Sequence, residues 1–169
     1  MDEKHTNQTL KDYEKNMNIG PSGLGGWLIL FAIGLIIAPL SFFFSITEYI
    51  LPLLNDGVTW REFTDPNSTN YLPLFSFLVY FELIGNIIFL LFSIFFLYLF
   101  FTKKRSFPRV YFWFLIINLL FILIDELLAN SMFVFDGFAY EETLRQAVPY
   151  AIWLPYLRVS KRVKNTFVN

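Results

Sequence analysis

The chain has 169 residues, of which 56% are hydrophobic, 21% are aromatic and only 16% are charged. A soluble domain is typically about 45 to 50% apolar, so this composition excludes an ordinary soluble domain and indicates an integral membrane protein. The net charge of −1 argues against nucleic acid as a partner, and the absence of cysteine excludes disulfides and thiolate-based catalytic, redox or metal sites.

Residues 1–23 are polar and mixed in charge, which predicts a solvated cytoplasmic tail. A short surface helix with Leu10, Tyr13 and Met17 on one face is the alternative. The tail lacks the basic start and short apolar core of a signal peptide, so we expect the first apolar segment to be retained. The single histidine, His5, has no partner ligands near it in the sequence, and we expect neither a metal nor a cofactor.

The first apolar segment, residues 24–46, has no formal charge and is long enough to cross a bilayer. Gly34, Ala38 and Ser41 follow one face of this predicted helix. Small residues allow close approach of another helix in lipid, so we predict a helix-packing face here. The alternative is that these residues are merely scattered, as in any membrane helix.

Residues 47–71 contain turn sequences and are predicted to form a structured outer loop. Thr59 and Glu62 have the spacing of a capping box for a short helix. Trp60 and Phe63 would then lie at the membrane interface, or alternatively grip a ligand.

The second predicted span, residues 76–101, is almost continuously apolar but contains Glu82 and Asn86. These two residues are four positions apart and share one helical face with Phe89 and Ser93, a face that we expect to turn away from lipid. A short basic connection follows, which predicts that the next span lies antiparallel to this one.

The third predicted span, residues 109–129, repeats this arrangement with different polar groups. Asn118 and Asp125 share its inward face, and Glu126 lies beside that face. Ionisable groups inside a membrane are costly, so they are functional candidates.

The fourth segment is harder to assign, because its uncharged centre, residues 146–157, is as short as a re-entrant segment. Extending it to residues 138–158 gives a full span but takes Arg145 into the membrane. Depth matching predicts an ion pair of Arg145 with Asp125, with Glu126 and then Glu82 as further choices. Alternatively, Arg145 extends to the outer headgroups without a partner.

Basic residues are distributed unevenly between the predicted sides of the membrane. The tail, the connection at 102–109 and the C-terminal segment hold eleven of the thirteen Lys and Arg residues. The positive-inside rule then places both termini in the cytoplasm. The sequence therefore predicts an all-α, integral membrane four-helix bundle over residues 24–169.

Four stretches resemble a known bacterial family of small four-span membrane proteins, catalogued as domain of unknown function 2569. They are Gly25 to Leu30 (GGWLIL), Phe81 to Asn86 (FELIGN), Ile152 to Tyr156 (IWLPY) and Ser160 to Phe167 (SKRVKNTF). The resemblance runs from about Leu24 to Val168. It implies a multi-pass protein of the bacterial inner membrane and carries over no catalytic or ligand-binding residue.

Two functions remain open at this point. The first is a non-enzymatic accessory or scaffold that associates with other membrane proteins or with itself, supported by the small-residue face and the lack of a complete catalytic site. The second is a small transporter or channel subunit that handles a proton or cation. It would use the predicted intramembrane polar cluster, which consists of Glu82, Asn86, Asn118, Asp125, Glu126 and Arg145.

Overall fold

The computed structural model describes residues 20–132 and 140–169, and in these ranges the regular secondary structure is helical throughout. Three described helices are long and apolar enough to cross a membrane, at Trp27–Asn55, Phe75–Phe101 and Phe107–Met132. The elements in chain order are α2 (Trp27–Phe44), the π-helical segment η1 (Ser45–Ile50), α3 (Leu51–Asn55), α4 (Gly57–Thr64), α5 (Phe75–Phe101), α6 (Phe107–Met132), α7 (Glu141–Val159) and α8 (Lys161–Thr166).

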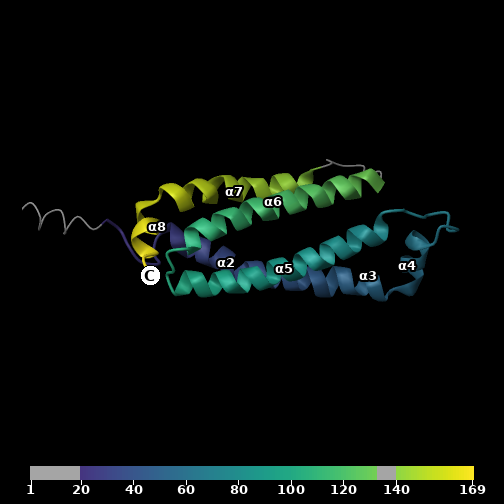
Figure 1. Ribbon diagram of the computed structural model, residues 1–169, viewed down its shortest axis with the longest axis horizontal. Coiled ribbons are helices and arrows are strands. Elements are labelled where there is room, and N and C mark those ends of the chain that lie inside the picture. The colour runs from purple at the N-terminus through teal and green to yellow at the C-terminus, as the bar shows by residue number, and fades with distance from the viewer. Residues whose placement is uncertain (1–19, 133–139) are drawn as a thin grey trace, which may run out of the picture.

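The long helices run side by side as two pairs. α2 packs against α5, α6 packs against α7, and α5 also packs against α6, so that the second pair is joined to the first (Figure 1). The start of α2, the connection between α5 and α6, α8 and the C-terminus lie at one end, which we call the basic end, while α3 and α4 lie at the other (Figure 1). The predicted antiparallel pairing of the second and third apolar segments is therefore present.

An aromatic core holds the helices together near the basic end. Phe31 of α2 lies 5.9 Å from Phe100, 5.2 Å from Tyr111 and 5.1 Å from Trp153, measured between ring centroids. These rings come from α2, α5, α6 and α7, so one cluster ties all four helices. Because lipid is as apolar as the rings, this cluster stabilises the fold through close packing rather than through exclusion of water.

The closest approach of α5 to α6 occurs at Gly85. A Cβ atom at this position would lie 2.1 Å from Cζ of Phe121, a distance that real side chains do not reach. Phe121 is itself held by rings of α5, at 4.4 Å from Phe81 and 5.1 Å from Phe89. Gly85 is thus required for this contact, although the sequence did not single it out.

The outer end differs from the prediction in two respects. The helix that begins at Trp27 does not end near residue 46 but continues through η1 and α3 to Asn55. The predicted capping box of Thr59 and Glu62 is wrong, because Asp56 is the N-cap of α4 and accepts hydrogen bonds from the N–H groups of Val58 and Thr59. Asp56 comes directly before α4, and aspartate is among the residues preferred at an N-cap.

The two aromatic residues of α4 pack on α5 and hold α4 against the bundle. Trp60 lies 5.9 Å from Phe75 and 5.8 Å from Tyr80, and Phe63 lies 4.9 Å from Phe75. Trp60 and Phe63 thus serve to pack α4 against α5.

The fourth segment forms α7, which begins at Glu141, but α7 is not among the helices apolar enough to be candidate spans. Its first turns carry Glu141, Glu142 and Arg145, which lower its hydropathy. Residues 133–139, where the predicted fourth span would begin, lie outside the described residues. So do residues 1–19, for which a solvated tail was predicted with a short surface helix as the alternative.

The C-terminal segment is docked at the basic end. Asn165 and Thr166 donate hydrogen bonds to the carbonyl groups of Gly20 and Gly23, at 3.4 and 3.3 Å. The chain end also bonds the connection between α5 and α6, since the N–H of Arg105 donates to the carbonyl of Asn169 at 2.7 Å. Two stretches that carry the family resemblance, near Gly25 and after Ser160, therefore meet in space.

Candidate functional site

A cavity of about 740 Å³ lies among α2, α5, α6 and α7, and we call it the polar groove. All six residues of the predicted polar cluster line it: Glu82, Asn86, Asn118, Asp125, Glu126 and Arg145. The small-residue face of α2, Gly34, Ala38 and Ser41, lines the same groove. The predicted polar cluster and the predicted small-residue face thus line one cavity.

Two of the three residues of the small-residue face, Gly34 and Ser41, are exposed in the described part of the chain. Gly34 is exposed, and a Cβ atom built on it would meet nothing within 4 Å. The Ser41 hydroxyl donates back to the carbonyl of Ile37 at 3.3 Å, within its own helix. Small side chains leave this side of the groove open instead of allowing a neighbouring helix to approach.

The aromatic core forms one end of the groove. Phe31, Tyr111 and Trp153 all line the cavity as well as belonging to the packed rings near the basic end. The charged lining residues Glu126, Glu142 and Arg145 lie toward the other end, where α6 ends and α7 begins. The groove therefore passes from an aromatic end to a charged end.

Both amides of the polar cluster have hydrogen-bond partners. Asn118 is buried, with 4% of its surface exposed, and its Oδ1 accepts a hydrogen bond from the Tyr150 hydroxyl at 2.7 Å. The Asn86 side-chain amide donates to the carbonyl of Glu82 at 2.8 Å, one turn back in α5. Asn118 thus links α6 to α7, whereas the side-chain hydrogen bond of Asn86 stays within α5.

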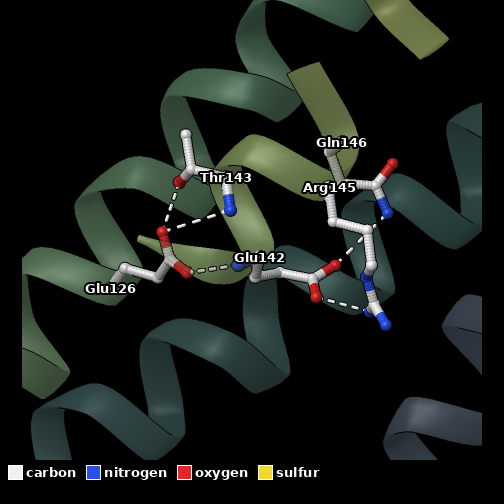
Figure 2. Close-up of polar contacts among 5 residues, drawn as sticks. All are labelled: Glu126, Glu142, Thr143, Arg145 and Gln146. Atoms are coloured by element: carbon white, nitrogen blue, oxygen red, sulfur yellow. Dashed lines mark hydrogen bonds and ion pairs between the residues drawn. The ribbon is translucent and has the colours of Figure 1, made fainter. Parts of the chain in front are cut away.

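Glu126 caps α7 across the groove. Its carboxylate accepts hydrogen bonds from the N–H of Glu142 at 2.8 Å, from the N–H of Thr143 at 3.2 Å and from the Thr143 hydroxyl (Figure 2). No side chain at the start of α7 caps it locally. A helix N-terminus carries unsatisfied N–H groups and a partial positive charge. A carboxylate from α6 accepts hydrogen bonds from these N–H groups and is attracted to that charge. Glu126 therefore has a structural role.

The predicted ion pair of Arg145 with Asp125 is wrong. Arg145 pairs with Glu142, three residues earlier in its own helix, and 71% of its side chain is exposed (Figure 2). Glu142 also accepts a hydrogen bond from the Gln146 amide at 3.3 Å. Arg145 is exposed and therefore needs no partner on another helix, and the carboxylate of Glu142, one turn earlier in the same helix, balances its charge.

Two carboxylates of the groove are left without such a role. Oδ1 of Asp125 is buried, and it has no hydrogen-bond partner among the described residues. Glu82 is half-buried and its carboxylate forms no hydrogen bond or ion pair within the same part of the chain. Buried polar groups are normally satisfied, so these two acids are available to an occupant of the groove.

The sequence interpretation missed the partners on α7. Tyr150 and Thr143 complete the contacts of Asn118 and Glu126, and Trp153 closes the aromatic end. Tyr150 and Trp153 are three residues apart and so share a helical face, which is the signal that could have placed them opposite α6. Nothing in the sequence indicated which residue of another helix each of them contacts, namely Asn118 for Tyr150 and Phe31 for Trp153.

Comparison with known proteins identifies the family but not an activity. No curated protein and no solved structure matches the chain. A family model matches residues 21–168, nearly the whole chain, including the groove and both docked terminal stretches. The chain belongs to the family described as Protein of unknown function (DUF2569).

Proposed function

We propose that this protein is a non-enzymatic accessory protein of the bacterial inner membrane, and that its polar groove receives a transmembrane helix of a partner membrane protein. The observation that carries the proposal is the small-residue face of α2, which lines the groove together with polar side chains of α5 and α6 and on which Gly34 faces open space. In lipid, helices associate through small residues that allow close approach and through interhelical hydrogen bonds. The groove offers both kinds of contact.

The chemistry of the groove specifies the partner further. Asp125 and Glu82 have no partner of their own among the described residues, so a helix that donates hydrogen bonds or carries a basic side chain at their level would satisfy them. Because the small residues belong to α2 and the two acids to α5 and α6, the partner helix would pack closely against α2 and direct its polar side chain toward α5 and α6.

The proposal includes a four-span topology with both termini cytoplasmic, in which α7 is the fourth span. It is supported by the eight basic residues of the 102–109 connection and of the C-terminal segment, which all belong to the basic end. The buried Asn118 and its hydrogen bond to Tyr150 also favour a close α6–α7 pair at membrane depth.

Photo-crosslinking in native membranes tests the groove. Benzoylphenylalanine placed at Gly34, inside the groove, should yield a protein adduct of one defined mass, whereas placement at Ile33, which is 49% exposed outside it, should not. Filling the groove with Ala38→Trp should abolish that adduct, and the matched change Ile36→Trp should leave it intact. A lipid-sized adduct at Gly34, or equal adducts at both positions, would refute a partner helix.

A second function is favoured by the same two unpartnered acids. Carboxylates on adjacent helices that face one cavity could bind a cation or carry a proton. Asp125→Asn and Glu82→Gln distinguish the two proposals. Loss of the crosslinked adduct with unchanged ion flux supports the accessory role, whereas loss of flux in protein that still forms the adduct supports ion handling.

A further inference from the structure

A second cavity, of about 450 Å³, lies at the basic end between α6, α7 and α8, and we call it the basic pocket. Four exposed basic side chains line it, Arg105, Arg109, Arg158 and Lys164, and no acidic residue does. Its floor consists of the buried apolar side chains Leu157, Val163 and Phe167. The pocket therefore concentrates positive charge above an apolar base.

None of these basic side chains forms an ion pair within the described part of the chain. The Arg158 guanidinium lies over the ring of Phe112, 4.0 Å from its centroid. Across the described residues, the ion pair of Arg145 with Glu142 is the single one present, and it lies at the opposite end of the molecule. The four basic groups of the pocket are thus free to bind an anion.

An apolar groove of about 600 Å³ adjoins the basic pocket on the lipid-facing side of α5 and α6. Trp113 lines both cavities and is 55% exposed. Along α6 the lining of the apolar groove extends from Val110 to Phe121. At about 1.5 Å per residue this is roughly 16 Å, and along α5 the lining extends farther, from Phe77 to Phe96, which is roughly 28 Å. The groove is therefore long enough for an acyl chain that crosses one leaflet, about half of the roughly 30 Å hydrocarbon layer.

We propose that the basic pocket and the apolar groove together bind one anionic glycerophospholipid. Its phosphate lies in the basic pocket, where arginine guanidinium groups are suited to bind phosphate oxygens through two parallel hydrogen bonds. One acyl chain passes Trp113 and lies in the groove between α5 and α6. Tryptophan is enriched at the boundary between headgroups and hydrocarbon, and basic pockets between membrane helices bind anionic headgroups.

Charge substitutions at matched positions test the headgroup site. We would titrate the purified full-length chain in detergent micelles with phosphatidylglycerol and count bound lipid by native mass spectrometry. Arg109→Gln combined with Arg158→Gln should weaken binding roughly 30-fold, as expected for two basic groups near the surface. Lys103→Gln combined with Lys161→Gln removes equal charge at the same end but outside the pocket, and should leave the affinity within about twofold. Equal losses in both variants would refute a specific site.

A second pair of variants tests the acyl chain without changing charge. Ile117 lines the apolar groove and Leu120 does not, and both are more than half exposed. Ile117→Trp should fill the groove and weaken phosphatidylglycerol binding about tenfold, whereas Leu120→Trp should not. If inorganic phosphate at millimolar concentration displaces the lipid and Ile117→Trp has no effect, the pocket binds a soluble anion. If phosphatidylcholine binds equally well, no anionic site exists; either result overturns the proposal.

Discussion

Replacing Glu126 by glutamine should destabilise the contact between α6 and α7. The change keeps the size of the side chain but removes its charge and turns one acceptor oxygen into a donor. One of the two oxygens binds the N–H of Glu142, and the other binds both the N–H and the hydroxyl of Thr143 (Figure 2). An amide at position 126 can keep only one of these acceptor sites.

The size of the effect follows from these bonds. A hydrogen bond to a charged group contributes about 1.5 to 3 kcal/mol to stability, and an acid at a helix N-terminus contributes about 0.3 to 1 kcal/mol more. Glu126 is only half-buried, so we take the lower end of the combined range, about 2 kcal/mol. For a chain of this length that corresponds to a fall in melting temperature of about 4 to 8 °C.

Thermal unfolding of the purified protein in detergent measures the change, and amide exchange shows where it acts. The N–H groups of Glu142 and Thr143 should exchange faster in Glu126→Gln than in the natural chain. Glu141→Gln is the matched control, because Glu141 is an exposed acid in the first turn of α7 that caps nothing. If both variants lower the melting temperature equally, or if the two amides exchange as before, the capping role is refuted.

Three further predictions concern other parts of the fold. Gly85→Ala should lower stability by about 1 kcal/mol or more, because overpacking against Phe121 outweighs the gain in helix propensity. Gly34→Ala should raise stability by up to about 1 kcal/mol, because the added methyl group meets nothing. If the melting temperatures of both variants shift in the same direction, this prediction is contradicted. A cysteine at Thr69 should react with an impermeant maleimide in spheroplasts and one at Lys161 only after permeabilisation; labelling of the latter in intact spheroplasts would mean that α7 does not cross. The Thr59 hydroxyl, together with the N–H groups of Thr59 and Val58, donates hydrogen bonds to the Asp56 carboxylate and lowers its pKa below the ordinary value of an aspartate. Ionised Asp56 should therefore stabilise α4 at any pH above that ordinary value, and the stabilisation should be lost as the pH falls through the lowered pKa. Exchange of the α4 amides measures this, and Asp56→Asn should abolish the pH dependence.

The sequence determined the class of the protein and the direction in which its polar residues face. The composition and the length of three apolar runs suffice to predict an all-α membrane protein. The apolar share is too high for a soluble domain, and long apolar runs span a membrane as helices. Helical spacing also placed Glu82 and Asn86 on one face and Asn118 and Asp125 on another, and the structure brings all four to one groove. Periodicity is a local property, so a single chain reveals it.

Only the tertiary structure decided which of these groups are paired. Glu126 and Asp125 are neighbours in sequence, yet Glu126 caps α7, whereas Asp125 faces the groove with a buried oxygen that has no hydrogen-bond partner in residues 20–132 and 140–169. Gly34 and Gly85 look alike in the sequence, yet one faces open space and the other admits Phe121. In each case the outcome depends on the rotation and separation of helices that are distant along the chain. In lipid the rotation and separation of helices are set by side-chain packing between them, and the pattern of residues within one helix does not specify that packing.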